Sequence, residues 1–176
     1  MISKVDTIPQ RIHQLQEGIS RRPIRVCIRN IWDINNHRFD RTETYTGFLC
    51  YDHHGQLLEG RLTRNPRPAD QKYLTEGDVY EISGFSVLSN PRQRKLTRLP
   101  YYIQINQDTK MSNITGIGPI FPVHNLSPQS YESLLRLATT PTYLPDVVGQ
   151  IRMMQNLDPF HPDDSTDLTV GLLLSR

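Results

Sequence analysis

Short segments in which apolar and polar residues alternate, each bounded by turn-forming residues, restrict the fold of this chain more than any other feature. In residues 24–32, IRVCIRNIW, isoleucine and valine side chains alternate with Arg25, Cys27 and Arg29. This two-residue period is typical of a half-buried β-strand. The other segments of this kind are 44–51, 56–63, 79–88 and 95–106. The pattern therefore predicts an all-β domain of five strands with only short helices.

The connections between these strands indicate how the sheet closes. Residues 69–75 are predicted to form a short helix that Gly77 ends, between the third and fourth strands. Gly84 suits a bulge or bend in the fourth strand, and Pro100 interrupts the fifth. Five strands with a helix in this position are the topology of an OB-fold barrel, whose outer side binds oligonucleotides. Another small all-β sandwich or barrel fits the alternation as well, because periodicity alone does not separate these folds.

The chain divides into four predicted regions. They are an N-terminal extension with a short helix over 8–17 (1–20), the barrel (21–110), a linker with one helix (111–143), and a partial second OB-fold with strands at 146–154 and 168–174 (144–176). The first helix places Ile12 and Leu15 on one face, and the GISRRP segment after it is interpreted as a linker. Ser127 is expected to cap the helix of the second linker, with Pro128 in its first turn.

The charge of the chain is unevenly distributed. The formal net charge is +2, but residues 21–110 carry +5 and residues 111–176 carry −3. A basic surplus in the predicted barrel favours a polyanionic partner. No apolar run approaches the ~20 residues that a membrane-spanning helix needs, and the N-terminus lacks the apolar core of a secretory signal. We therefore expect no membrane association and a location in the cytosol or nucleus.

Motifs for catalysis or metal binding are not found in the sequence. It contains no G-x-S-x-G, no phosphate loop and no paired carboxylates on a shared face. Cys27 and Cys50 do not form a C-x-x-C pair and are interpreted as buried thiols of a reducing compartment. His53 and His54 are adjacent, so they point to opposite sides of a turn and lack a third ligand nearby in the sequence. The chain is therefore predicted to have no enzymatic activity, no metal and no cofactor.

Four segments carry a resemblance to a known family. PIRVCIRNIWD, YDHHG, KYLTEGDVYEISGFSVLSN and RKLTRLPYYIQIN occur in this order within residues 20–110. They resemble the first DNA-binding OB-fold of the replication protein A large subunit, in its plant-type version. The most specific part is the pattern LxEGxVYxISxFxVxxN at 74–90, followed by LTR at 96–98. The resemblance implies non-enzymatic binding of single-stranded DNA in replication, repair and recombination, and therefore a nuclear protein.

The resemblance continues beyond the barrel. IGPIFPVHNLSPQSYESLL is similar to the linker between consecutive OB-folds of that family, and TYLPDVVGQIRMM is similar to the first strand of the second OB-fold. LTVGLLL would then be its second strand, and too few residues follow Tyr143 to close another barrel. Two strands with open edges should pack on the first barrel, pair with a second copy of the chain, or fray. A homodimer or a protein partner that binds through 144–176 is therefore one of the alternatives.

The residues expected to bind nucleic acid combine cations, which contact phosphates, with flat side chains, on which bases stack for about 1–3 kcal/mol each. From strand phase and loop position they are Arg25, Arg29, Trp32, Arg38, Phe39, Arg61, Arg64, Arg92, Arg94, Lys95, Arg98 and Tyr102. The hairpin VLSNPRQRKLTR at 87–98 holds four of these cations and is predicted to close over one side of a nucleic-acid groove. A merely solvated hairpin is the alternative.

Two aromatic positions of the resembled family hold other residues in this chain. Members of the family place one aromatic near the end of strand 3 and another early in strand 5, where this chain has Thr63 and Arg94 or Lys95. The expected substitutes are Trp32, Phe39 and Tyr102, of which Trp32 and Phe39 also suit packing at the rim. Five other aromatic residues are assigned to core or sheet packing: Tyr45, Phe48, Tyr80, Phe85 and Tyr101.

Two functions of different kinds fit the sequence. The first is an OB-fold that binds single-stranded DNA with little sequence preference and strong salt dependence, with RNA as an alternative ligand. The second is a protein-interaction or assembly module that binds nucleic acid weakly or not at all. The basic barrel favours the first function. The missing aromatic positions and the unfinished second barrel favour the second.

Overall fold

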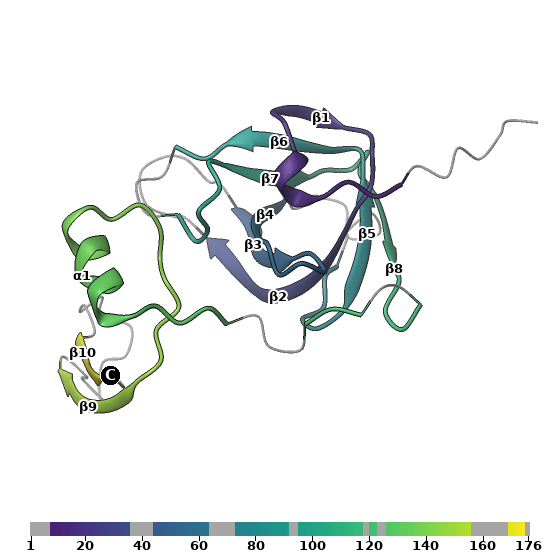
Figure 1. Cartoon of the computed structure of the whole chain (residues 1–176). Helices are drawn as coiled ribbons and strands as arrows, with labels where there is room; N and C mark the ends of the chain where they lie inside the picture. Colours follow the sequence, from purple (N-terminus) through teal and green to yellow (C-terminus); the bar gives the residue numbers. More distant parts are fainter. Residues whose placement is uncertain are drawn as a thin grey trace, which may run out of the picture. The chain divides into compact units, whose positions relative to one another are not determined.

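The computed structural model describes residues 8–35, 44–63, 73–91, 95–117, 120–122, 126–155 and 169–174. The chain divides into two compact units, Met1–Asn125 and Leu126–Arg176. The first unit consists mainly of strands (Figure 1). Its elements are η1 (Ile12–Gln14), β1 (Gly18–Ser20), β2 (Ile24–Asn35), β3 (Thr44–Tyr51), β4 (Leu57–Thr63), β5 (Val79–Ser83), β6 (Phe85–Ser89), β7 (Tyr101–Ile105) and β8 (Lys110–Asn113). The second unit contains α1 (Tyr131–Thr139), β9 (Gln150–Gln155) and β10 (Thr169–Leu173).

The strands of the first unit pair in the order of an OB-fold. β2 pairs antiparallel with β3, and β3 pairs antiparallel with β4. β4 pairs in parallel with β7, which pairs antiparallel with β6. β5 returns to pair with β2. Because only Gly84 separates β5 from β6, both ends of this ladder belong to one bent strand, and the sheet curls on itself (Figure 1). This closed five-stranded arrangement confirms the predicted OB-fold barrel.

Gly84 divides the fourth predicted strand. The segment expected over 79–88 is two strands, β5 and β6, and Gly84 between them has a φ of +73°. A residue with a Cβ is strained at such a φ. The Gly84 N–H donates to the Ser20 carbonyl at 2.8 Å. The glycine therefore lets one strand serve two sides of the barrel, as the bend predicted from the sequence requires.

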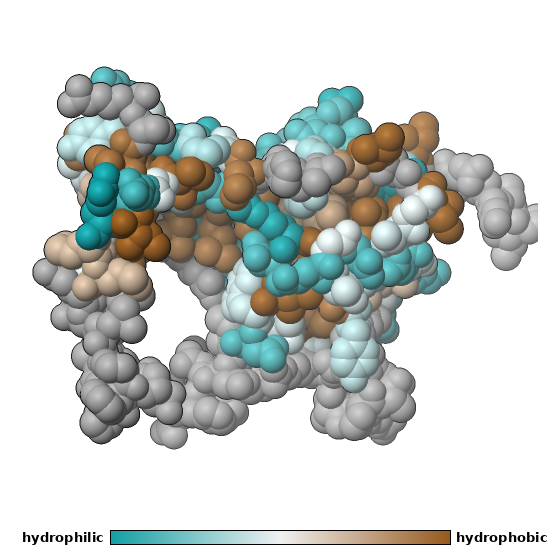
Figure 2. All heavy atoms as spheres, turned by 90° about the horizontal axis from the view of Figure 1, so that it is seen from below, coloured by the Kyte–Doolittle hydropathy of each residue, from teal (hydrophilic) through white to brown (hydrophobic). Residues whose placement is uncertain are grey.

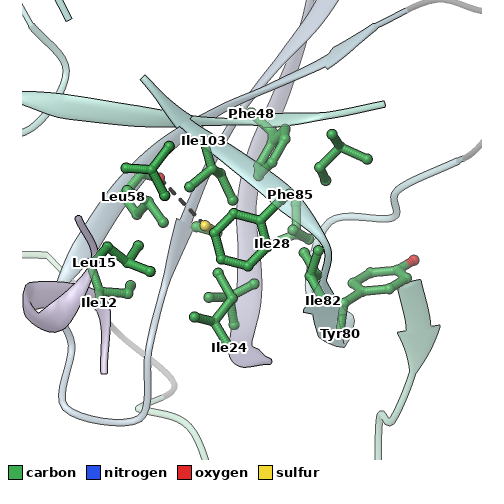
Figure 3. Packing of buried hydrophobic residues seen from close by; sticks show 14 of the residues in the cluster. Ile12, Leu15, Ile24, Ile28, Phe48, Leu58, Tyr80, Ile82, Phe85 and Ile103 are labelled. Carbon is green, nitrogen blue, oxygen red and sulfur yellow. Dashed lines mark hydrogen bonds between the residues drawn. The ribbon is translucent and has the colours of Figure 1, made fainter. Parts of the chain in front are cut away.

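Alternate residues of each barrel strand point into a common core (Figure 3). Ile24, Val26 and Ile28 of β2 are at most 1% exposed, as their alternation predicts. Large buried side chains from the other strands are Phe48, Leu58, Ile82, Phe85 and Ile103. The buried thiol of Cys50 donates to the Leu58 carbonyl at 3.4 Å, the dashed line in Figure 3. Apolar burial of about 25 cal/mol per Å² makes this cluster the main source of stability of the barrel.

The N-terminal extension packs against this core. Instead of a helix over 8–17 it forms the short 3-10 helix η1, whose Ile12 is 0% exposed, while Leu15 just after it is 5% exposed. Figure 3 shows both side chains at the edge of the core cluster, and the Tyr101 hydroxyl donates to the Ile12 carbonyl at 2.9 Å. The shared face of Ile12 and Leu15 is confirmed, but their three-residue spacing suits a 3-10 turn as well as an α-helix. The GISRRP segment, predicted to be a linker, contains β1, which pairs with β6.

The fifth barrel strand is shorter than predicted. β7 begins at Tyr101 instead of Lys95, because Pro100 has no N–H to donate to a neighbouring strand. The Pro100 carbonyl accepts a hydrogen bond from the Asn90 N–H at 2.7 Å. That bond closes the base of a loop over residues 90–100. The cationic half of the predicted strand therefore belongs to this loop.

Two further differences concern the edges of the barrel. β8, which the sequence did not indicate, pairs antiparallel with β5 and extends to Asn113, beyond the predicted end of the barrel at residue 110. Its sequence KMSN is too short and too polar to indicate a strand without its neighbour. The helix predicted over 69–75 is absent at 73–75. The rest of that prediction lies outside the described residues.

The helix of the second unit is capped later than predicted. α1 begins after Ser130, whose Oγ accepts a hydrogen bond from the Ser133 N–H at 3.3 Å. Ser130, and not Ser127, is therefore the N-cap that satisfies a free N–H of the first turn. The Ser127 N–H donates instead to Asp146 Oδ2 at 3.0 Å. This bond ties the residues before α1 to those before β9.

The strands of the second unit form a small antiparallel sheet. β9 covers the second half of the strand predicted over 146–154, and β10 lies within the one predicted over 168–174. α1 has no buried residue, and apolar side chains of both strands are exposed, so that brown atoms lie at the surface in Figure 2. That this sheet begins a second OB-fold stays a prediction. Across the described residues, no helix has the length and apolar character to span a membrane.

Candidate nucleic-acid interface

The side of the barrel that faces away from the core is built from β2, β3, β4 and β7. Side chains alternate along a strand, so the neighbours of the buried residues Phe48, Leu58 and Ile103 point outward. We define this outer face by Trp32, Tyr45, Gly47, Leu49, Tyr51, Leu57, Glu59, Arg61, Thr63, Tyr102 and Gln104. The pairing places four of them in one row across the strands, in the order Trp32, Gly47, Arg61 and Gln104.

Arg61 lies within this row, between two aromatic rings. Its Cζ is 4.8 Å from the ring centroid of Tyr45 and 4.0 Å from that of Tyr102. Both distances are within the range of cation–π attraction. The rings hold the guanidinium in position without neutralising its charge. The Arg61 Nε is buried and has no hydrogen-bond acceptor among the described residues, which is unusual for a buried polar group.

Trp32 lies against the sheet at one end of the row. A Cβ added at Gly47 would overlap the indole at Cε2 and Nε1. Trp32 therefore depends on a residue without a side chain at position 47. The indole stays half-exposed, and β3 separates its strand from that of Arg61. The row thus combines a flat aromatic side chain with a cation, the two features that single-strand binding requires, and this position favours the binding role predicted for Trp32.

The loop over 90–100 is anchored to the outer face through Glu59. Glu59 alternates with the core residues Leu58 and Leu62, yet it is only 1% exposed. The Asn90 Nδ2 group donates to Glu59 Oε2 at 3.0 Å, and Asn90 itself is 4% exposed. A buried carboxylate needs such donors, because leaving it without them is costly. The hydrogen bond therefore fixes to β4 the base of the loop that carries Lys95 and Arg98.

The other predicted cations are distributed around this row. Arg25 forms an ion pair with Glu81 at 2.8 Å across β2 and β5, so its charge is matched by a carboxylate outside the row. Arg29 lies at a bulge in β2, where the register with β3 shifts. In the loop, Lys95 is half-buried and Arg98 is exposed. Five predicted residues lie outside the described part of the chain: Arg38, Phe39, Arg64, Arg92 and Arg94.

Tyr45 is the candidate that sequence reasoning missed. It is assigned to packing, but lies on the outer face, half-buried against Arg61. Its register partner on β4 is Thr63, the position where the family has an aromatic, so Tyr45 brings a ring to nearly the same place from the next strand. Strand phase holds the signal, since Tyr45 is an odd number of residues from the buried Phe48. The other four residues of that group pack in or against the core as predicted: Phe48, Tyr80, Phe85 and Tyr101.

The opposite end of β3 is covered by the chain itself. Tyr51 is 7% exposed. Its hydroxyl donates to the Pro122 carbonyl at 3.0 Å, and the Phe121 ring packs edge-on against it at a centroid distance of 6.0 Å. Burial raises the pKa of Tyr51 to about 12, and the positive charge of Arg29 opposes this shift. This end of the face therefore has an aromatic ring and a cation, but the ring is not open to solvent.

The remaining ionisable groups do not form a second site in the described residues. Within these ranges, no three His, Cys, Asp or Glu side chains are grouped as a metal ion would require. Cys27 and Cys50 are free and buried, as predicted. Burial raises the pKa of the Cys50 thiol, so it stays protonated and is a poor nucleophile. The prediction that His53 and His54 point to opposite sides of the turn after β3 is wrong, because their rings lie against each other at a centroid distance of 3.9 Å and an interplanar angle of 42°.

These features define an OB-fold domain with a cationic and aromatic outer face. No protein-family model matches the sequence, and no curated protein matches it either. A similar solved structure is an OB domain from Methanosarcina mazei, with 13% identity and a TM-score of 0.44, covering 65% of this chain and 94% of that one. Another is fission yeast Pot1 with single-stranded DNA, with 8% identity and a TM-score of 0.43, covering 63% of this chain and 41% of that one. A murine DNA-binding protein bound to double-stranded DNA has 14% identity and a TM-score of 0.40, covering 61% of this chain and 48% of that one.

The chain thus spans less than half of the Pot1 and murine structures. The strand order and pairing of this chain are what make it an OB-fold. These similarities concern the fold, so any function has to be inferred from the residues of this chain.

Proposed function

We propose that this chain is a non-enzymatic OB-fold protein whose outer face binds single-stranded DNA. The observation that carries the proposal is the position of Arg61, a cation held between Tyr45 and Tyr102, for which the described residues provide no carboxylate partner. Such a site offers a positive charge to phosphates and the half-exposed rings of Trp32 and Tyr45 to bases. Tyr102 is only 9% exposed, so its ring holds the guanidinium and is not open to a base. The basic surplus of residues 21–110 adds a long-range attraction for a polyanion.

The geometry of the outer face favours a single strand over a duplex. Trp32, Tyr45 and Arg61 lie on adjacent strands, which are separated by about 4.8 Å, so their side chains form one continuous surface. Unpaired bases can lie on such a surface. In a duplex the bases are stacked on one another, and only the phosphates and the groove edges remain accessible. Binding should weaken as salt increases, because contacts to phosphates release counterions.

The biological setting is proposed from the family resemblance. The segments within residues 20–110 that resemble replication protein A support a role in DNA replication, repair or recombination, and a nuclear location. RNA would satisfy the same chemistry, because a cation and stacking rings do not read the sugar. The ligand that we propose is DNA, and RNA is an outcome of the test.

A second candidate function is assembly, with a second copy of the chain or another protein as partner. The observation that favours it is the apolar surface of the second unit. There β9 exposes Ile151 and Met153, β10 exposes Leu172, and α1 buries no residue. Strands with open edges and apolar side chains pair readily. Assembly and DNA binding would use different parts of the chain, so both can be tested on the same protein.

Fluorescence anisotropy tests the proposed function. The full chain is titrated into a labelled dT strand of about 20 nucleotides at two salt concentrations, beside a duplex and a uridine strand of equal length. The dT strand should bind more tightly than the duplex, and less tightly at the higher salt. Arg61→Ala should lower the affinity about tenfold, since one stacked or ionic contact is lost. Arg21→Ala is the matched control, because Arg21 is an exposed cation in the turn before β2.

The outcomes separate the two functions. If dT does not bind at low salt, the DNA-binding proposal is wrong, and sedimentation of the full chain then tests assembly. Tighter binding of the uridine strand would make RNA the ligand. Equal effects of Arg61→Ala and Arg21→Ala would show that binding depends on total charge and not on this site.

A further inference from the structure

The outer face contains a second aromatic position, Tyr51, besides the one at Arg61. β3 runs from the Tyr45 end to the Tyr51 end with an unbroken register against β4. A strand rises about 3.3 Å per residue, so the two tyrosines stand roughly 20 Å apart on the same face. Nucleic acid that contacts Arg61 over only a few nucleotides would not reach Tyr51. A longer strand would.

The chain itself fills this second position. Phe121 packs its ring against Tyr51 at 6.0 Å and an interplanar angle of 71°, an edge-to-face contact. The following residue, Pro122, accepts the hydrogen bond of the Tyr51 hydroxyl at 3.0 Å. Tyr51 is only 7% exposed. A ring from the segment that follows the barrel therefore lies where a base would otherwise contact Tyr51.

The apolar residues just before Phe121 do not anchor this segment by burial. Ile117 and Ile120 are 87% and 93% exposed, so they contribute almost no burial. An edge-to-face ring pair and a neutral hydrogen bond each stabilise a contact modestly. A stacked base gains a comparable free energy. The contacts of Phe121 and Pro122 are therefore strong enough to close the position, yet comparable to what a competing base would gain.

We propose that Phe121 and Pro122 form a strap that occupies the second stacking position of the outer face and thereby limits the number of nucleotides that the barrel binds. This inference rests on the proposed function. It assigns Phe121 and Tyr51 a role in length specificity. Removing the strap would therefore add a stacking ring to the outer face.

A length series of dT strands tests the strap. Strands of about 4 to 12 nucleotides cover the lower and middle range of OB-fold site sizes. They are titrated with the wild type, Phe121→Ala and Tyr51→Phe. Tyr51→Phe removes only the hydroxyl that bonds to Pro122 and keeps the ring. Ile120→Ala is the matched control, since Ile120 belongs to the same segment but is almost fully exposed.

The result is read as the affinity of each variant relative to wild type at each length. For the shortest strand the ratio should be near one. For the longest strands Phe121→Ala and Tyr51→Phe should bind about fivefold more tightly, as one added stacking contact implies. Ile120→Ala should follow the wild type at every length. Thermal unfolding of each variant checks that the barrel is intact.

Three results would overturn the proposal, and they are distinguishable from one another. If the wild type binds no strand of any length, the proposed function fails and the strap fails with it. If the wild type binds but both variants follow its curve, only the strap is wrong. If Phe121→Ala weakens binding of the long strands alone, Phe121 is a base-stacking residue and not a competitor.

Discussion

The two ends of β3 on the outer face carry the same residue type in opposite situations. At one end, Tyr45 lies against Arg61, whose charge has no carboxylate partner in the described chain. At the other, Tyr51 lies under Phe121, and its hydroxyl is bound to a backbone carbonyl. Residue type and an outward-facing position are therefore not enough to make a tyrosine a binding residue. Its neighbour from another segment decides whether the ring is available to a ligand.

The largest effect is expected from reversing the charge at the open end. Arg61→Glu replaces the cation between two rings by an anion that repels phosphates, so the affinity for a dT strand should fall roughly 100-fold. The slope of log affinity against log salt should become shallower, because a phosphate contact is lost. Anisotropy titrations over several salt concentrations measure both. Arg21→Glu is the control, and an equal loss there would remove the distinction between the two ends of β3.

A smaller effect is expected from the hydrogen bond between Asn90 and Glu59, which attaches the loop over 90–100 to β4. Asn90→Ala removes the donor to the buried Glu59 carboxylate and should lower the free energy of unfolding by about 1–3 kcal/mol. It should also weaken dT binding, because the cations of the loop lose their fixed position. Glu59→Gln keeps an acceptor for Asn90 and should be milder. Urea unfolding measures the stability of both variants. An unchanged unfolding midpoint for Asn90→Ala would show that the hydrogen bond does not hold the loop.

A third prediction concerns the row through the open end. Gly47→Ala should displace the Trp32 indole, which lies where a Cβ would go, and should lower dT affinity about fivefold through the lost stacking surface. If Gly47 acts through Trp32, the double variant with Trp32→Ala should bind no more weakly than Trp32→Ala alone. Additive losses in this cycle would mean that Gly47→Ala disturbs the sheet instead.

The smallest effect is expected for the pKa of Tyr51, at the end of β3 that Phe121 covers. The pKa of Tyr51 is raised from 10.0 to about 12, chiefly by burial. Because the folded-state pKa is the higher one, the associated stability is complete below pH 10 and is lost as the pH rises from about 10 to 12. Phe121→Ala should expose the ring and lower this pKa toward 10. Tyrosine Cζ chemical shifts measured against pH give the pKa of Tyr51, and Ile120→Ala is the control. An unchanged pKa in Phe121→Ala would show that Phe121 does not shield Tyr51 from solvent.

Much of the barrel could be predicted from the sequence. The alternation in β2, β3 and β4 is strong because these strands have one face in the core, and Gly84 marks the bend in the fourth strand. The edge strands β1 and β8 could not be predicted, since three or four residues form a strand only beside a neighbour. The cap at Ser130 was missed because Ser127 followed by proline is an equally good local signal.

The candidate site could be predicted in part. Strand phase and residue type indicate Arg61 and Trp32, and both lie in the same row of the outer face. They do not indicate that Tyr45 and Tyr102 enclose Arg61, because that depends on the register of three strands. Nor do they indicate Phe121, which lies far from Tyr51 in the sequence.

The sequence by itself determined which side of each strand is apolar, where the chain bends and where its cations are concentrated. The tertiary structure decided which outward residues remain available to a ligand. Glu59 is buried with Asn90, Arg25 is paired with Glu81, and Tyr51 is covered by the chain. The physical reason is that alternation is a property of one strand, set by the geometry of its backbone. Exposure and charge pairing depend on contacts between segments that only the closed barrel brings together.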